Sequence, residues 1–581
     1  MKKFVAMLLV AAMAFSLAAC GGSSDGGSTS DGAGAAGETV TATTGGDGVT
    51  FYYPRFYNVF DPSIQPDYDY ALWYSTLWCM DYDACSIDGN TGATYTYLEA
   101  AGDVADSWEV ASDFSTITVK IKSGVKFQTL DSQYDYYGGR ELTASDVAYS
   151  YNRLIGQADG LAVDASDYGW HAEASGDASG NAMGGGTLDI LAYAEATDDS
   201  TVVFHMASAD ETSVNTLMTL PINLCGPEWD TLSEAQQNDW HYACGTGAFI
   251  LTNYVQDQSM TFTKNPDYYG TVNVDNVTLV YIGDNTTITS QLEGGSLDWV
   301  GEKSSQNVLT LDQINALASN SSLVQYDYAG SAPMGIGLRV TQEPYSNLDF
   351  RIALQQLINM DDVLAYQGMS GSPIISGLWN VNSSWSAHEK IQAELADDYA
   401  YDYEGALEVI KSYGYSESNP LEMIIALDPL GDADLMNYVK NVYEATGIIT
   451  VELESFDDPM AQSMVVGDST SDHLFGFTAG GMDTLLQAQL MTMEGGFGYG
   501  FFYDDTTYPD LINKLAAAQT MSEQAEIAQE ADYYFTSQHW TIAIGGVSTE
   551  TEFMSSRIGN YNGQKVYGNG NMRVVLRNIT L

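Results

Sequence analysis

The stretch LTASDVAYSYNRL, residues 142–154, predicts an amphipathic helix with a capped start. Thr143 and Asp146 have the spacing of a capping box, in which each side chain bonds the backbone N–H of the other residue. Val147, Tyr151 and Leu154 then recur at helical spacing, which places them on one apolar stripe. We expect this stripe to pack against a core.

Segments with strand periodicity flank this helix on both sides. Apolar residues alternate with polar ones in residues 115–121 and again in 259–263, the pattern of a half-buried strand. Residues 277–282 are more continuously apolar, which is typical of a strand buried on both faces. Strands therefore occur both before and after the predicted helix.

Further helices are predicted in the C-terminal half. They cover about residues 350–359, about 403–410 and a last segment from 522 to 535. Gly414 follows the second of these, where glycine commonly ends a helix because it accepts a positive φ. Interleaved helices and strands predict a mixed α and β architecture, and the chain has enough residues for more than one large core.

The order of these segments resembles that of solute-binding protein family 5, the dipeptide-, oligopeptide- and nickel-binding subunits of ABC importers. The likeness depends on short motifs that occur together in the family's order over nearly the whole body of the chain. The matching stretches are residues 58–62, 104–110, 124–127, 142–154, 245–249, 264–269, 295–298, 349–354 and 402–415. Extra residues between 127 and 142, and a loop at 156–187, depart from the family's pattern.

The resemblance implies a two-lobed, periplasmic-binding-protein-like fold of the large dipeptide- and oligopeptide-binding type, with paired crossover strands between the lobes. It also implies an extra subdomain in the first lobe. On this basis lobe I is expected to comprise residues 49–87, 220–325 and 526–581. The extra subdomain is expected at 88–219 and lobe II at 326–525.

The N-terminal residues have the features of an export signal. A basic start and an apolar run from 4 to 15 precede Leu17-Ala18-Ala19-Cys20, which resembles the bacterial lipobox. We therefore expect residues 1–20 to be a lipoprotein signal and Cys20 to carry the lipid that holds the protein at a membrane. Residues 21–48 are mainly Gly, Ser, Thr, Ala and Asp, the composition of a flexible tether.

The charge balance excludes some classes of partner. The chain has 77 Asp and Glu against 20 Lys and Arg, a net charge of −57. Nucleic acid and anionic lipid headgroups would be repelled. An acidic cleft for cationic ligands is one interpretation, and a solvated acidic surface that keeps the protein soluble is the other.

Four cysteines follow Cys20, and an even set in an exported protein suggests disulfides. We expect Cys79 to pair with Cys85, and Cys225 with Cys244, because these are closest in sequence; buried free thiols are the alternative. No metal or other cofactor is predicted, since no spacing is Cys-x2-Cys and the six His never pair closely.

Candidate ligand-binding residues come from loops that match the family. In its peptide-binding members an Asp after a Gly-Trp pair holds the peptide's amino group. Here Gly476 and Phe477 replace that pair, Gly480 occupies the Asp position, and Asp483 is the nearest acid, although it could instead cap a helix. The other candidates are Tyr68, Asp69, Tyr70, Met334 and Trp379.

Together these features predict an extracytoplasmic solute-binding lipoprotein that delivers peptides to an ABC permease. We expect a monomer on the outer face of the cytoplasmic membrane, in a Gram-positive bacterium. An oligosaccharide or chelated-metal binder of the same fold is the main alternative, and a surface adhesin or sensor would share the anchor. An exported hydrolase is disfavoured, because no His-Glu-x-x-His or Walker motif occurs, and no enzymatic activity is expected.

Overall fold

The computed structural model describes most of the chain beyond its N-terminal segment. The described residues are 48–53, 60–62, 71–80, 100–155, 190–219, 222–256, 258–300, 311–329, 335–366, 375, 378–379, 384–427, 433–456, 465, 468, 470–477, 505–544, 549–561 and 571–581. The predicted signal, lipidated Cys20, most of the tether and the loop at 156–187 lie outside these residues.

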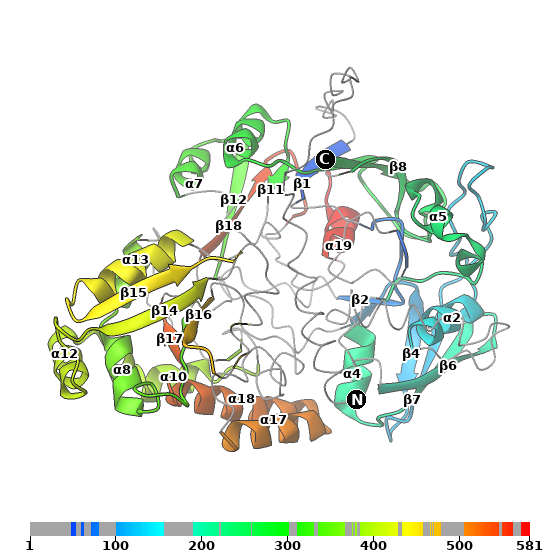
Figure 1. The fold of residues 1–581 in the computed structure, drawn as a ribbon. Helices are drawn as coiled ribbons and strands as arrows, with labels where there is room; N and C mark the ends of the chain where they lie inside the picture. Colours follow the sequence, from blue (N-terminus) through cyan, green and yellow to red (C-terminus); the bar gives the residue numbers. More distant parts are fainter. Residues whose placement is uncertain are drawn as a thin grey trace, which may run out of the picture.

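A mixed seven-stranded sheet forms the centre of the first lobe (Figure 1). β1 pairs in parallel with β10 and β11, whereas β8, β9 and β18 run antiparallel to their neighbours. In spatial order the strands are β12 (Leu323–Ala329), β18 (Thr549–Ser555), β11 (Trp299–Val300), β1 (Gly48–Tyr52), β10 (Asn276–Val280), β9 (Ser259–Lys264) and β8 (Phe249–Val255). The accompanying helices include α6 (Asn285–Gly294), α7 (Leu311–Ala318) and α19 (Asn571–Asn578).

Two of the predicted strands lie in this sheet. Met260 and Phe262 are fully buried on one face of β9, which confirms the alternation. Val277, Thr278 and Leu279 of β10 are all buried, as expected for a strand covered on both faces. The sequence pattern therefore located the sheet's interior correctly.

A four-stranded antiparallel sheet with its own core is attached to this lobe. Its strands, in spatial order, are β4 (Ala105–Val110), β5 (Thr116–Ile121), β7 (Thr201–Met206) and β6 (Leu191–Asp198). α2 (Ala144–Leu154) packs on it, and the capping box between Thr143 and Asp146 is present as predicted. The buried side chains of α2 and β5 meet in one apolar cluster, so residues 142–154 contribute to the core of this subdomain, as predicted.

The second lobe is built on a five-stranded sheet. Its order is β15 (Ile449–Glu454), β14 (Leu421–Leu427), β16 (His473–Phe477), β13 (Gly335–Gly337) and β17 (Thr541–Ala543). The helices around it include α8 (Leu348–Gln356), α10 (His388–Glu394), α12 (Tyr403–Ser412), α13 (Ala433–Glu444), α17 (Thr507–Ala517) and α18 (Met521–Ser537). All three predicted C-terminal helices are present, and Gly414 has the expected positive φ of 97°.

The return of the chain to the first lobe occurs later than we expected. We placed residues 526–581 in lobe I, but α18 packs against Trp379 in a cluster of the second lobe. β17 then pairs with β13 in the second lobe's sheet. Residues 526–543 therefore belong to lobe II. The sequence of β17 did not reveal this, because the lobe of a strand is set by the strand it pairs with, and that partner is distant in the chain.

Gly247, from one of the family-like motifs, lies directly against the backbone of the first lobe. A Cβ atom there would be 2.5 Å from the Trp73 carbonyl carbon, whereas one at Gly294 would meet no atom within 4 Å. We expect Gly247→Ala to lower the free energy of unfolding by about 1–3 kcal/mol through overpacking. Gly294→Ala should be neutral or slightly stabilising. Urea unfolding of both variants checks this, and equal effects would contradict it.

A buried histidine should make the second lobe sensitive to acid. Burial lowers the pKa of His539 from 6.5 to about 4, against the opposing effect of Asp398. Below about pH 6.5 the His539 side chain of the unfolded chain binds a proton that the folded state does not bind. The free energy of unfolding should therefore decrease by up to about 3 kcal/mol as the pH falls from about 6.5 to about 4. Asn tolerates the positive φ of His539, so His539→Asn should unfold in urea without this part of the pH dependence. An unchanged dependence would exclude His539 as its source.

Candidate functional site

The parallel strands of both sheets end at the same junction between the lobes. In the first sheet, β12 is parallel to β11 because both are antiparallel to β18, so the carboxyl ends of β1, β10, β11 and β12 share one edge. In the second sheet, the carboxyl ends of β14, β16 and β17 lie at the edge where Gly335 begins β13. Ligands of α/β proteins bind outside carboxyl ends of this kind.

Two chain connections join these edges. β12 leads from Ala329 to Gly335 of β13, and β17 leads from Ala543 to Thr549 of β18. β12 and β18 form an antiparallel ladder over their whole length and extend from the first sheet toward the second lobe (Figure 1). Paired connections of this type can act as a hinge, because only a few residues must change conformation when two lobes move.

Phe477 is the predicted ligand-binding residue at the end of a strand of the second lobe. It ends β16 at the carboxyl edge and pairs with Gly335, which ends the first connection. Met334 precedes Gly335 in the chain but lies outside the described residues, as do Tyr68, Asp69, Tyr70 and Asp483. The placement of these five residues remains a prediction.

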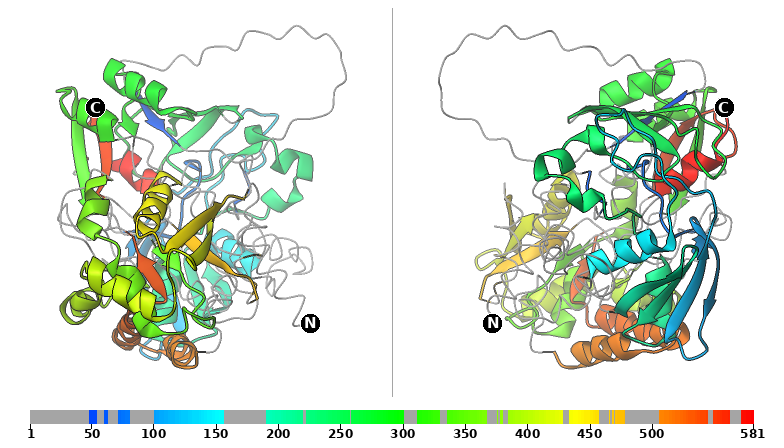
Figure 2. Two further views of the ribbon diagram at one scale, coloured as in Figure 1. Left: turned by 60° about the vertical axis from the view of Figure 1, so that its left-hand side comes forward. Right: turned by 90° about the vertical axis from the view of Figure 1, so that its right-hand side faces the viewer.

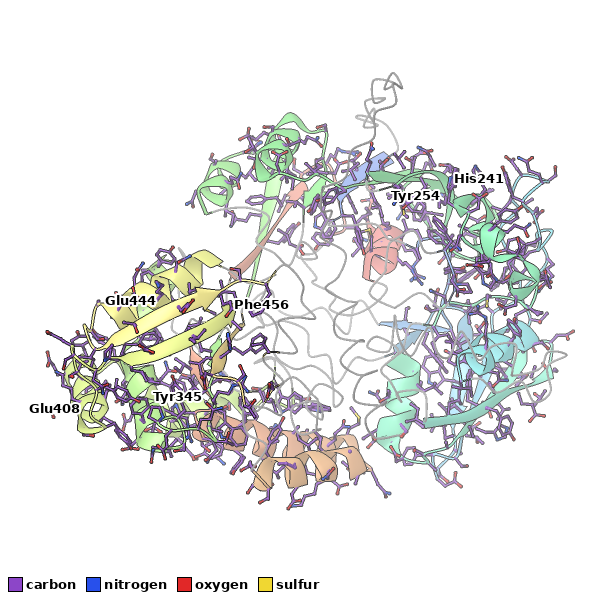
Figure 3. The ribbon with its side chains drawn as sticks, viewed as in Figure 1. His241, Tyr254, Tyr345, Glu408, Glu444 and Phe456 are labelled. Carbon is purple, nitrogen blue, oxygen red and sulfur yellow. The ribbon has the colours of Figure 1, made fainter. Side chains whose placement is uncertain are left out.

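Phe456 is a cleft candidate that the sequence interpretation missed. It follows the carboxyl end of β15 and is only partly buried against the neighbouring cluster. In Figure 3 it lies on the side of the second lobe toward the middle of the molecule, whereas Glu408 lies on the outer side. An aromatic residue just beyond a strand was the available signal, but the edge at which β15 ends became clear only from the sheet.

Trp379 is not a ligand-binding residue in this structure. Its side chain is fully buried, its indole N–H donates to the Ala528 carbonyl at 2.9 Å, and its ring packs edge-on against Trp385. The prediction from its Gly-Leu-Trp-Asn loop is therefore wrong, since α18 covers the ring that we expected to face a ligand.

The expected disulfide between Cys225 and Cys244 is also absent. Both are free, buried thiols, and the Cys244 thiol donates to the Gln128 carbonyl at 3.3 Å. Burial raises the pKa of Cys225 to about 12, which keeps its thiol neutral. Cys79 is free as well, and Cys85 lies outside the described residues. Closeness in sequence did not join the sulfur atoms of Cys225 and Cys244.

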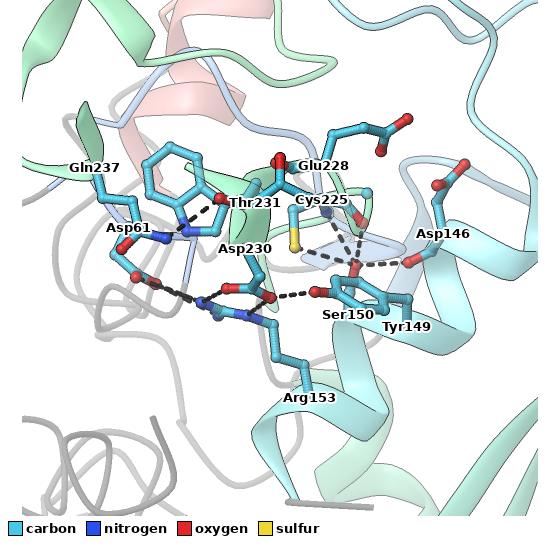
Figure 4. Close-up of polar contacts among 12 residues, drawn as sticks. Asp61, Asp146, Tyr149, Ser150, Arg153, Cys225, Glu228, Asp230, Thr231 and Gln237 are labelled. Atoms are coloured by element: carbon cyan, nitrogen blue, oxygen red, sulfur yellow. Dashed lines mark hydrogen bonds and ion pairs between the residues drawn. The ribbon is translucent and has the colours of Figure 1, made fainter. Parts of the chain in front are cut away.

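Arg153 connects the subdomain helix α2 to the chain that follows β1 (Figure 4). Its buried guanidinium bonds Asp230 at 2.9 Å and Asp61 at 3.4 Å, and Tyr149 donates to Asp230. Burial disfavours the charge, but Asp61 and Asp230 raise the pKa of Arg153 well above its ordinary value. Because Asp61 precedes the segment with Tyr68 to Tyr70, this ion pair fixes the start of a candidate ligand-binding loop.

A second buried ion pair lies beside a small cavity inside the first lobe. Arg577 of α19 bonds Asp103 at 2.6 Å, and the cavity has a volume of about 10 Å³, which is room for about one water molecule. All residues that line the cavity lie outside the second lobe: Leu72, Tyr74, Ser75, Asp103, Ala248, Phe249, Tyr268, Arg573 and Arg577. It is therefore not the space between the lobes.

Residues 99–485 match the family model described as bacterial extracellular solute-binding proteins, family 5 middle. The chain belongs to this family. Family 5 is a class of extracytoplasmic solute-binding proteins of ABC importers, not of enzymes. Among the described residues, no helix has the length and apolar character needed to span a bilayer.

Relatives of this family 5 chain include binders of several solutes. Di/tripeptide-binding protein 1 of Pseudomonas aeruginosa is 24% identical over 332 residues, 55% of this chain and 56% of the relative. Heme-binding protein A of Haemophilus influenzae is 24% identical over 54% of this chain and 53% of its own length. The chain thus spans about half the length of the curated relatives it matches.

Solved structures of family 5 proteins share the fold over nearly the whole chain. DppA from Helicobacter pylori in complex with the peptide STSA has a TM-score of 0.64 at 19% identity, covering 93% of this chain and 98% of DppA. NikA from Brucella suis in complex with Fe(III)-EDTA has a TM-score of 0.67 at 14% identity, covering 90% of this chain and all of NikA. The predicted two-lobed α/β fold is therefore confirmed.

Proposed function

We propose that this chain is the solute-binding subunit of an ABC importer and that it captures di- or oligopeptides between its lobes. The observation that carries the proposal is the pair of facing carboxyl edges joined by two connections. Relatives named as di- and tripeptide-binding proteins support peptides as the solute. Catalytic activity is not expected.

Binding would favour the closed arrangement of the lobes. A ligand that contacts both lobes only when they are closed shifts the population toward that state. The extended backbone of a peptide can pair with main-chain groups as a strand does at a sheet edge, a mode that tolerates varied side chains. Its charged ends need specific partners, since a buried unpaired charge is costly, and Asp483 is our candidate for the amino group.

The proposed location is the outer face of the cytoplasmic membrane of a Gram-positive bacterium. Cys20 would carry the lipid, residues 21–48 would be the tether, and a monomer would deliver its ligand to permease subunits. Cys20→Ser should abolish the incorporation of labelled fatty acid into the protein and release it from the membrane. Unchanged membrane association in that variant would contradict lipid anchoring.

A peptide mixture should stabilise the purified protein against heat. At a ligand concentration of about 100 times Kd the gain is about 2.7 kcal/mol, readily measured as a thermal shift. Nickel–histidine chelates, hemin and an oligosaccharide panel should produce no comparable shift. A response to one of these instead of peptides would overturn the peptide assignment and retain the binding fold.

Asp483→Ala should abolish the thermal response to peptides. Loss of the carboxylate would leave the peptide's ammonium group without a partner in the closed cleft. Glu408→Ala is the matched control, because Glu408 is an exposed carboxylate on the outer side of the second lobe (Figure 3). A full peptide response in the Asp483 variant would remove Asp483 from the site.

A further inference from the structure

The two lobes also touch at a place away from the crossover strands. There α4 (Glu211–Thr219), next to the four-stranded sheet, meets the turn between α17 and α18 of the second lobe. The Glu211 N–H donates to the Gln519 carbonyl at 3.1 Å, and the Met521 N–H donates to the Glu211 carboxylate at 3.1 Å. The Thr212 hydroxyl, which donates to the Asp210 carboxylate at 2.6 Å, also lies 3.3 Å from the Ala518 carbonyl. We refer to these contacts of residues 211–212 with residues 518–521 as the latch.

The latch provides hydrogen-bond acceptors for the first N–H groups of two helices. Glu211 is the first residue of α4 and Met521 is the first residue of α18. N–H groups in the first turn of a helix have no acceptor within that helix. Here the N–H of each first residue finds its acceptor in the other lobe. The Glu211 carboxylate also lies at the positive end of the α18 dipole, which strengthens its bond to Met521.

Each half of the latch is firmly anchored in its own lobe. Val214 and Leu217 of α4 are buried in the subdomain's core. Leu515 of α17 and Ala528 of α18 are buried in a core cluster of the second lobe. Because both halves are held by packing, the latch can form only when the lobes themselves are close together.

The latch lies across the molecule from the crossover strands. In Figure 1, α4 and α17 lie at the bottom, whereas β12 and β18 lie toward the top. The right-hand view of Figure 2 likewise shows α17 and α18 beside the four-stranded sheet. A rotation of the lobes about the crossover strands would therefore move the two halves of the latch farther apart than residues near those strands.

We propose that Glu211 is a positioning residue that holds the lobes closed and so raises the affinity for the captured solute. The role in affinity rests on the proposed function, whereas the effect on closure does not. If only the closed state binds tightly, the apparent Kd rises as the closed fraction falls. A lost charge-assisted hydrogen bond would lower the ratio of closed to open molecules by about tenfold.

Amide hydrogen exchange in the unliganded protein tests the latch directly. Glu211→Ala should speed exchange at the Met521 amide about tenfold and increase the radius of gyration measured by X-ray scattering. Glu211→Gln keeps an acceptor oxygen and should restore most of the protection. Glu523→Ala is the matched control, since the Glu523 carboxylate accepts from the Gln519 N–H within the second lobe. It should leave the radius of gyration unchanged.

A ligand titration separates this inference from the proposed function. With trialanine as the probe, Glu211→Ala should bind more weakly than the wild type by up to about tenfold, and Glu523→Ala should bind equally well. Absence of trialanine binding to the wild type would count against the proposed function, and the scattering experiment would still test whether the latch holds the lobes closed. An unchanged radius of gyration in Glu211→Ala would overturn the proposal, because the Met521 amide loses its acceptor in that variant whether or not the lobes open.

Discussion

Replacing Arg577 with methionine should lower the free energy of unfolding by roughly 3–5 kcal/mol, the cost of breaking a buried ion pair. The guanidinium bonds Asp103 at 2.6 Å and the Tyr268 hydroxyl at 3.1 Å. Burial disfavours ionised Asp103, but Arg577 and a hydrogen bond from Tyr269 hold the pKa of its carboxyl below the ordinary value. Without Arg577, the donors to this carboxylate among the described residues would be the neutral groups of Thr76 and Tyr269.

Urea unfolding at neutral pH is the measurement, and a second substitution tests the cause. In Arg577→Met combined with Asp103→Asn the uncompensated charge is gone, so part of the lost stability should return. Lys440→Met is the surface control: Lys440 and Glu444 form a partly exposed pair at 3.2 Å, and its loss should change stability by less than about 1 kcal/mol. A double variant no more stable than Arg577→Met would exclude the buried charge as the cause.

Arg153→Met should have an effect of similar size, roughly 3–5 kcal/mol. The Arg153 side chain is 1% exposed and its charge is balanced by Asp61 and Asp230. Methionine fills much of the same volume but leaves two carboxylates next to an apolar side chain. The loss should also affect ligand binding, because Asp61 precedes the proposed loop that carries Tyr68.

Arg140→Met is the matched control for this prediction. Arg140 lies near the start of α2 and bonds two acids, Asp146 and Glu228, both at 2.7 Å, but its side chain is 31% exposed. Solvent can therefore replace part of what is lost, and we expect a smaller decrease of about 1 kcal/mol in the same urea experiment. Equal losses in the two variants would show that burial does not determine the cost.

The sequence alone determined the features that depend on neighbouring residues. The capping box of Thr143 and Asp146, the strand alternation at Met260 and Phe262, and the glycine that ends α12 are all present as predicted. Each depends on residues a few positions apart, whose spacing is fixed by helix or strand geometry. The order of such motifs was also sufficient to indicate the family.

The tertiary structure decided what depends on residues far apart in the chain. It paired β17 with β13, buried Trp379 beneath α18, and kept Cys225 and Cys244 apart. It also brought Arg153 to Asp61 and Glu211 to Met521. Such contacts depend on the path of the whole chain, because a residue's own neighbours do not specify which distant group will pack against it. Local spacing therefore predicted the elements, and only their assembly showed which side chains hold the lobes together.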